Sequence, residues 1–189
     1  MTPDDRRFMA LALAMGRRGA GQTWPNPAVG CVLVKDGRVL GRGWTQPGGR
    51  PHVERVALDR AGDAARGATA YVTLEPCAHH GQTPPCADGL IAAGVARVVV
   101  AADDPDPRVS GRGIAKLREA GIEVQTGGLG PEAEADLAAF LRRVTGRLPE
   151  VTLKLAASRA GRVATATGES QWITGPEARA VVHGMRAAA

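Results

Sequence analysis

The sequence predicts an α/β fold: a three-layer α/β/α sandwich around a mixed five-stranded sheet, followed by an incomplete second domain. Three observations lead to this expectation. Asp36-Gly37, a dipeptide typical of two-residue hairpin turns, joins two apolar segments and predicts an antiparallel pair of strands. Helical and strand-like segments then alternate, as in parallel sheets covered by helices on both faces. A linker over 146–149 separates a first domain, residues 1–146, from a segment over 147–189.

The elements of the first domain follow from local signals. Thr2-Pro3 supplies a capping hydroxyl and a proline at the first helical position, and Gly19-Ala20-Gly21 ends the helix that begins there. Val98-Val99-Val100 predicts the buried centre of a strand. We expect the sheet to be antiparallel at the first hairpin and parallel afterwards. The expected strands span 29–35, 38–43, 68–74, 97–102 and 122–125, and the further helices span 52–61, 86–93, 114–120 and 132–143.

The segment after the linker is predicted to open with a strand over 151–156. Gly161 and Gly168 predict turns, and Pro176 begins a helix that runs to the last residue. The apolar side chains of the predicted strand would lack a partner, and we therefore expect that the chain can form a homo-oligomer.

Charge and composition limit the function classes. The net charge is +5, with Arg supplying 21 of the 24 basic residues, which fits either attraction of phosphate or a compositional bias. No run of five basic residues exists and aromatic residues make up only 3%, so we expect no nucleic-acid partner. The N-terminal stretch does not resemble a signal peptide, and no apolar run is long enough to span a bilayer. We expect a cytoplasmic protein with reduced thiols and no membrane partner.

Three short motifs contain the residues typical of a metal centre: His52-Val53-Glu54, Pro76-Cys77 and Pro85-Cys86. One imidazole and two thiolates suit Zn²⁺ and leave its fourth tetrahedral position open to water. The motifs fall at predicted helix starts and at a strand end, where the sites of α/β proteins collect. A His-x-Glu followed by two Pro-Cys motifs is the pattern of zinc enzymes that deaminate nucleobases, in which Glu54 would carry protons without binding the metal.

Other interpretations of these residues remain open. Cys77 and Cys86 could be free buried thiols or form a disulfide, although the adjacent prolines and the polar loop argue against simple core packing. A structural zinc site would take a fourth protein ligand, His79 or His80. Cys31 lies within an apolar segment and is expected in the core.

The spacing of the cysteines narrows the field. Eight residues separate Cys77 from Cys86, where general nucleobase deaminases usually carry two. The segments 73–77 and 83–86, Thr-Leu-Glu-Pro-Cys and Thr-Pro-Pro-Cys, resemble the deaminase half of the bifunctional riboflavin-biosynthesis deaminase-reductase family. Pro25-Asn26-Pro27 supports this resemblance, which covers the whole chain.

The resemblance implies a cytidine-deaminase-like fold and a defined reaction. The substrate would be a phosphorylated pyrimidine, diaminohydroxyphosphoribosylaminopyrimidine, deaminated by zinc-dependent hydrolysis to aminophosphoribosylaminouracil and ammonia. By this resemblance His52, Cys77 and Cys86 would bind one zinc ion. Glu54 would be the proton carrier, and Asn26 would lie against the base.

The segment after the linker resembles the start of the family's reductase domain, which has a dihydrofolate-reductase-like fold. Residues 152–158 and 168–174 carry this resemblance, and there Ala156 and Trp172 would contact NADPH. The family's reductase continues well beyond the length present in this sequence. Because roughly 40 residues cannot enclose a dinucleotide and a substrate in a core of their own, we expect no reductase activity.

Five positions depart from the family's pattern, among them Trp24 in place of a usual His and Ala28 in place of a polar or large residue. Gln82 stands where Lys or Arg is common in the family, and that basic residue would contact phosphate. Asp106 stands where Asn is common. Val53 replaces an alanine between the predicted ligand and the predicted proton carrier. Gln82 and Asp106 bear on the affinity for substrate more than on the type of reaction.

Two other functions compete with the riboflavin-pathway deaminase. One is a deaminase that acts on a base within nucleic acid, which would need basic tracks and stacking aromatics along the strand. The other is a non-catalytic, zinc-stabilised module. In that module a nitrogen of His79 or His80 would occupy the fourth zinc position in place of water.

Overall fold

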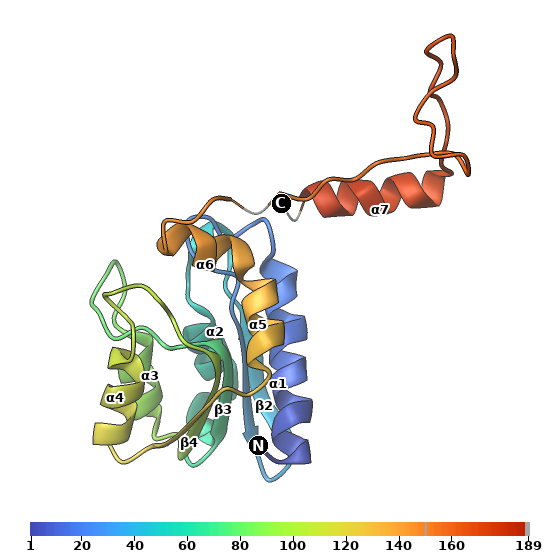
Figure 1. The fold of residues 1–189 in the computed structure, drawn as a ribbon. Helices are drawn as coiled ribbons and strands as arrows, with labels where there is room; N and C mark the ends of the chain where they lie inside the picture. The colour runs from blue at the N-terminus through green and yellow to red at the C-terminus, as the bar shows by residue number, and fades with distance from the viewer. Residues whose placement is uncertain (150, 188–189) are drawn as a thin grey trace. The chain divides into compact units, whose positions relative to one another are not determined.

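The computed structural model describes residues 1–149 and 151–187. The chain divides into two compact units, Met1–Pro149 and Glu150–Ala189. In the first unit, helices cover both faces of a central sheet (Figure 1). This three-layer arrangement confirms the predicted α/β/α sandwich.

The sheet contains five strands in the order β2-β1-β3-β4-β5. Strands β3, β4 and β5 are parallel, while β1 is antiparallel to both β2 and β3. The predicted mixed sheet is therefore confirmed, but the expectation of parallel pairing everywhere after the hairpin is wrong. The connection through α2 places β3 beside β1, on the side away from β2 and parallel to β2. Strand β1 therefore lies between two strands that both run antiparallel to it. The strands are β1 (Gly30–Lys35), β2 (Arg38–Trp44), β3 (Thr69–Leu74), β4 (Arg97–Ala102) and β5 (Glu123–Thr126).

Helices α1 and α5 lie on one face of the sheet and α2, α3 and α4 on the other (Figure 1). The predicted single helix over 132–143 is wrong. The backbone leaves the helical region at Leu137 (φ −102°, ψ 6°), whose buried side chain joins the core, so that two short helices replace one. The helices of this unit are α1 (Pro3–Gly16), α2 (Val53–Ala61), α3 (Cys86–Ala93), α4 (Arg112–Glu119), α5 (Gly130–Asp136) and α6 (Ala138–Val144).

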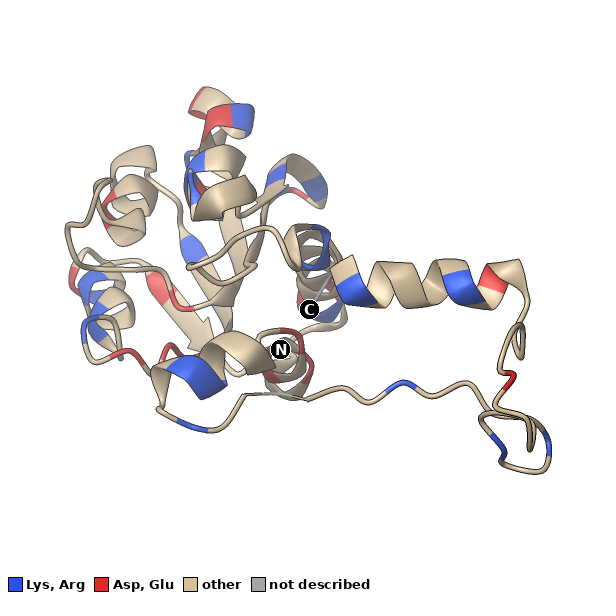
Figure 2. Cartoon of the chain, turned by 90° about the horizontal axis from the view of Figure 1, so that it is seen from above, with Lys and Arg blue, Asp and Glu red and all other residues tan. Residues whose placement is uncertain are grey.

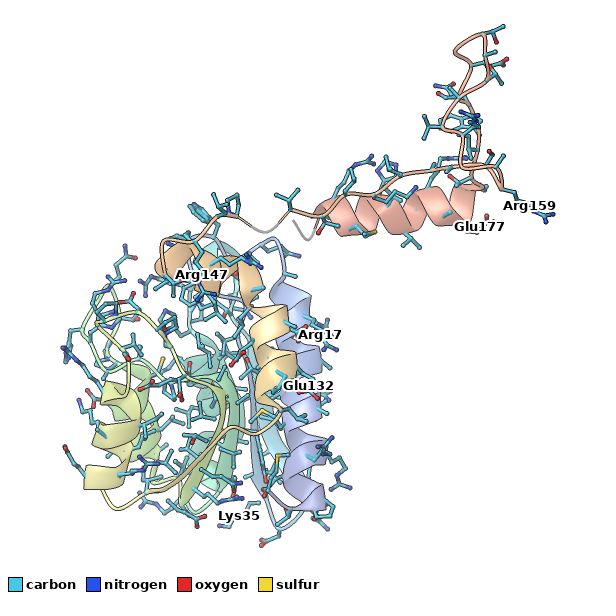
Figure 3. The ribbon with its side chains drawn as sticks, viewed as in Figure 1. Arg17, Lys35, Glu132, Arg147, Arg159 and Glu177 are labelled. Carbon is cyan, nitrogen blue, oxygen red and sulfur yellow. The ribbon has the colours of Figure 1, made fainter. Side chains whose placement is uncertain are left out.

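The hydrophobic core lies between the sheet and the two helical layers, and side chains fill this space (Figure 3). Val98, Val99 and Val100 in β4 are fully buried, as predicted for a strand covered on both faces. Cys31 is also fully buried in β1, which confirms its expected place in the core. The predicted hairpin turn is present, with positive φ at both Asp36 (49°) and Gly37 (72°), the backbone that this type of turn requires.

A buried charged network fastens α1 to the sheet. Asp5 lies in the first turn of α1, where its carboxylate accepts a hydrogen bond from the backbone N–H of Thr2 (2.8 Å) in a capping box. The same carboxylate accepts hydrogen bonds from the Tyr71 hydroxyl (2.9 Å) and the Arg97 guanidinium (2.7 Å). One side chain thus links α1, β3 and β4.

The second unit contains one described helix, α7 (Pro176–Ala187). The predicted helix from Pro176 is confirmed as far as Ala187, and its last two residues lie outside the described part of the chain. The predicted strand over 151–156 is wrong, because a strand needs a ladder partner and no strand occurs in residues 151–187. Side chains in this unit, including those of Arg159 and Glu177, project from the ribbon (Figure 3). Among the described helices of the chain, none combines the length and apolar character that crossing a bilayer requires.

Candidate metal centre

The three predicted metal ligands converge in the structure. Nδ1 of His52 lies 3.3 Å from Sγ of Cys86 and 3.7 Å from Sγ of Cys77. All three ligand atoms lie within 4.8 Å of one another. Zinc–sulfur and zinc–nitrogen bond lengths imply N···S separations of roughly 3.6 Å in a tetrahedral site. The donor set and its spacing therefore fit a zinc ion.

Each ligand is positioned at the end of a regular element. His52 directly precedes α2, Cys77 follows β3 within three residues, and Cys86 is the first residue of α3. The backbone N–H of Cys86 donates a hydrogen bond to Sγ of Cys77 (3.3 Å). The N-terminus of α3 therefore faces this sulfur and favours its ionised form.

Hydrogen bonding determines how the three groups titrate. Hydrogen bonding from the Cys86 thiol, followed by that from His52, outweighs burial and holds the pKa of Cys77 at about 4. The same hydrogen bond, together with burial, raises the pKa of Cys86 well above its ordinary value. The hydrogen bond to Cys77 also raises the pKa of His52. At neutral pH the cluster thus holds an ionised sulfur, which is the form of cysteine that binds metals.

Glu54 lies beside the cluster as the second residue of α2, and only 4% of its surface is exposed. Burial is the main cause that raises the pKa of this carboxyl, and the negative charge of Cys77 adds to it. A carboxyl group whose pKa is shifted towards neutrality can both accept and return a proton. The predicted proton carrier therefore has a suitable environment.

A cavity of about 340 Å³ joins these groups. His52, Cys77 and Glu54 line it, together with Asn26 and Asp104. Its volume lies within the range of sites that bind small molecules. The candidate metal centre is therefore accessible from a pocket large enough for a small molecule.

Asn26 holds the segment that carries His52. Its Nδ2 donates a hydrogen bond to the carbonyl oxygen of Gly49 (2.8 Å) and lies 3.4 Å from Nε2 of His52. This contact accompanies an imidazole orientation in which Nδ1, and not Nε2, faces the two sulfurs. The sequence does not reveal this role, because it depends on residues more than twenty positions apart. The contact of Asn26 with a base remains a prediction.

Glu75 fastens the strand end that carries Cys77. Its carboxylate accepts hydrogen bonds from the backbone N–H groups of Gly111 (3.0 Å), Gly113 (3.0 Å) and Ile114 (3.2 Å) at the start of α4. The approach is so close that a β carbon on Gly113 would lie 1.9 Å from the carbonyl oxygen of Pro76. Glycine at this position therefore lets α4 pack against the metal-binding loop.

The cavity lining also contains charged residues that sequence reasoning missed. Burial raises the pKa of Asp104 to about 6, and this carboxylate accepts a hydrogen bond from the backbone N–H of Asp106 (2.9 Å). Asp104 follows β4 by two residues, and its place at the carboxyl end of a parallel strand was a usable signal. Arg50 and Arg108 also line the cavity, and no local pattern distinguishes them from the other arginines.

The other predicted site residues occupy varied places. In the described part of the chain, the metal-binding group contains neither His79 nor His80. His79 lines the cavity, while His80 and Gln82 are exposed and do not line it. The predicted NADPH contacts, Ala156 and Trp172, border a surface cavity of about 520 Å³ within the second unit.

Comparison with known proteins identifies the family. A profile for the zinc-binding region of cytidine and deoxycytidylate deaminases matches residues 2–102. The chain belongs to this family. A profile for the RibD C-terminal domain matches residues 149–189.

Relatives of known name match almost the whole chain. The riboflavin biosynthesis protein RibD of Escherichia coli K12 is 56% identical over 183 residues, which cover 97% of this chain and 50% of that protein. A structure of Acinetobacter baumannii RibD matches with a TM-score of 0.88 and 49% identity, covering 98% of this chain and 52% of that one. A Thermotoga maritima structure matches with a TM-score of 0.90 and 44% identity, covering 97% and 53%. The predicted resemblance and the cytidine-deaminase-like fold are confirmed, and the chain spans about half the length of the curated relatives it matches.

Proposed function

We propose that the first unit catalyses the zinc-dependent hydrolytic deamination of diaminohydroxyphosphoribosylaminopyrimidine, which yields aminophosphoribosylaminouracil and ammonia. The observation that carries this proposal is the convergence of His52 Nδ1 with the sulfurs of Cys77 and Cys86 beside the buried carboxyl of Glu54. The choice of substrate is supported by similarity to the Thermotoga maritima protein, which is described as a diaminohydroxyphosphoribosylaminopyrimidine deaminase and uracil reductase.

In the proposed reaction, His52 would hold Zn²⁺ through Nδ1, and Cys77 and Cys86 through their sulfurs. A zinc ion in such a site supplies an acidified water molecule as the nucleophile. Glu54 would accept one proton from the attacking water and pass it to a ring nitrogen. It would then carry the remaining proton of the new hydroxyl group to the amino group, which leaves as ammonia while the carbon–oxygen double bond forms. The substrate carbon thus exchanges a bond to nitrogen for a bond to oxygen.

The test is ammonia release by the zinc-loaded full chain supplied with the phosphoribosylaminopyrimidine. Glu54→Gln should lower turnover by about 10²–10⁴-fold, because it removes only proton transfer. The zinc content should stay that of the wild type. The matched control is Glu132→Gln on α5, at an exposed position, which should leave turnover unchanged.

Two outcomes would contradict the proposal. Ammonia released from single-stranded RNA or tRNA, and not from the pyrimidine, would favour the nucleic-acid deaminase. In the described residues, however, basic positions are spread over several elements and alternate with acidic ones (Figure 2). No ammonia from a folded, zinc-bearing protein would favour the non-catalytic module. The proposal covers deamination alone, and the NADPH contacts of Ala156 and Trp172 stay predictions.

A further inference from the structure

We propose that Arg50, which lines the metal-site cavity, and Thr83, which is bonded to it just outside the cavity lining, form the subsite that binds the substrate's phosphate group. The inference rests on the proposed function in one respect, since the bound anion is taken to be the phosphate of the pyrimidine substrate. It assigns the recognition of charge to Arg50, which no family motif contains, together with Thr83 of the Thr-Pro-Pro-Cys motif.

The pair joins the two segments that carry the metal ligands. Nη1 of Arg50 donates a hydrogen bond to the Thr83 hydroxyl oxygen (3.1 Å). Arg50 precedes His52 by two residues, and Thr83 precedes Cys86 by three. The guanidinium and the hydroxyl are therefore held at a defined place relative to the reacting centre, as a subsite for a distal group of the substrate requires.

Arg50 differs from the other two arginines that line the cavity. Arg108 is neutralised by Asp106, with Nη2 and Oδ2 2.6 Å apart, and this hydrogen bonding holds the pKa of Asp106 at about 2. Arg143 donates a hydrogen bond to the carbonyl oxygen of Pro25 (2.8 Å) and lies over the ring of Trp24.

Within residues 1–149 and 151–187, no carboxylate lies within 4.0 Å of the Arg50 guanidinium. Four of its five N–H groups have no protein acceptor in this part of the chain. Half-buried and uncompensated, this guanidinium has the planar donor geometry that matches the oxygens of a phosphate. The Thr83 hydroxyl accepts from Arg50 and keeps its own proton to donate to the same anion.

A second observation concerns the imidazole of His79, which lines the cavity and carries an unsatisfied nitrogen. Nδ1 of His79 is buried and has no hydrogen-bond partner in the described part of the chain. A β carbon on Gly81 would lie 3.9 Å from Nη2 of Arg50 and 4.0 Å from Nε2 of His79, so both side chains border the space that glycine leaves open. Because a buried polar atom without a partner is costly, this region is suited to a polar ligand.

The subsite also explains how the chain can tolerate Gln82. The family resemblance places a basic residue at that loop position, but Gln82 is exposed and does not line the cavity. Arg50 reaches the same loop from the opposite segment through its bond to Thr83. The positive charge would then come from the segment that precedes His52.

The kinetic test compares the phosphorylated pyrimidine with its dephosphorylated form, using the zinc-loaded full chain. Arg50→Gln should raise KM for the phosphorylated substrate about 10–100-fold, while kcat changes less than about threefold and the dephosphorylated substrate is unaffected. Thr83→Val should raise the same KM about 3–10-fold. Arg50→Lys, which keeps the charge and loses the fork, should fall between wild type and Arg50→Gln.

The matched control is Arg55→Gln, because Arg55 lies exposed on α2 and is paired with Asp59 away from the cavity lining. Its KM should equal that of the wild type. Equal KM values for wild type and Arg50→Gln would overturn the subsite and leave the deaminase intact.

A binding measurement separates the subsite from the reaction. Ribose 5-phosphate, titrated calorimetrically into the zinc-loaded protein, should bind wild type and Arg55→Gln and lose about 10-fold or more in affinity with Arg50→Gln. That result supports the subsite even where no ammonia is released, in which case only the proposed reaction fails. Absence of binding to the wild type, or equal binding to wild type and Arg50→Gln, overturns the subsite.

Discussion

Both units of this chain contain apolar segments with a strand-like sequence, but they bury them very differently. In the first unit Val98, Val99 and Val100 are fully buried. In the second, Leu153 and Trp172 remain 79% and 70% exposed, and no residue from 151 to 187 is buried. A strand-like apolar segment therefore forms a strand only where a neighbouring strand completes the hydrogen-bond ladder and a helical layer covers the face.

The same difference separates the two sets of predicted site residues. Around the metal centre, Asn26 holds the segment that carries His52, and Glu75 holds the loop that carries Cys77. In the second unit, Trp172 lies under the Arg179 guanidinium at 4.2 Å and borders an open surface cavity with Ala156. Surrounding hydrogen bonds therefore hold the predicted metal-binding residues in place, whereas Ala156 and Trp172 lie at an open surface.

The largest expected effect comes from breaking the metal centre. Cys77→Ala removes one of three ligands and should abolish stoichiometric zinc binding and lower ammonia release more than about 10³-fold. Metal analysis and the assay of turnover measure both. The control is Cys31→Ala in the core, which should cost about 1 kcal/mol of stability and retain zinc. Stoichiometric zinc in Cys77→Ala would show that this sulfur is not a ligand.

Stability of the first unit should depend on the buried carboxylate of Asp5. The hydrogen bond from Arg97 holds the pKa of Asp5 well below its usual range. Asp5→Asn should therefore lower the free energy of unfolding at pH 7 by about 1.5–3 kcal/mol, measured by urea unfolding.

The effect of Asp5→Asn on the free energy of unfolding should depend on pH. A carboxyl whose pKa is lowered by folding stabilises the protein above its unfolded value, about 3.9, and this contribution is lost as the pH falls towards the folded value. The difference between wild type and Asp5→Asn should shrink below about pH 4. Asp4→Asn, at an exposed neighbour, should show neither effect. An unchanged difference at low pH would show that the ionised carboxylate is not the stabilising form.

The structural features that could be predicted from the sequence are those encoded by short contiguous segments. The Asp36-Gly37 turn, the buried Val98-Val99-Val100 strand and the metal-binding motifs each carry their signal within a few positions. The five strands and the convergence of His52, Cys77 and Cys86 could be predicted for this reason. The break at Leu137 could not, because its side chain leaves the helical pattern to fill a core formed by distant elements.

Contacts between separate loops gave no sequence signal. The Arg50–Thr83 bond and the Asn26–Gly49 bond each join loops that come together only in the fold. No local sequence pattern distinguishes Arg50 from the other arginines, of which the chain has 21 in all. These residues are identified by three-dimensional placement, which is why the candidate metal-binding group could be predicted while the proposed phosphate subsite could not.

The smallest expected effect tests the second unit directly. Leu153→Ala should change the free energy of unfolding by less than about 0.5 kcal/mol, because its side chain is already exposed. The same substitution at Leu90, fully buried in α3, is the control and should cost about 2–5 kcal/mol. A loss of more than about 1 kcal/mol at Leu153 that grows with protein concentration would show that a second copy buries this side chain, as in a homo-oligomer. A partner chain would then bury apolar side chains of the second unit, whereas the helices and strands of the first unit bury its own.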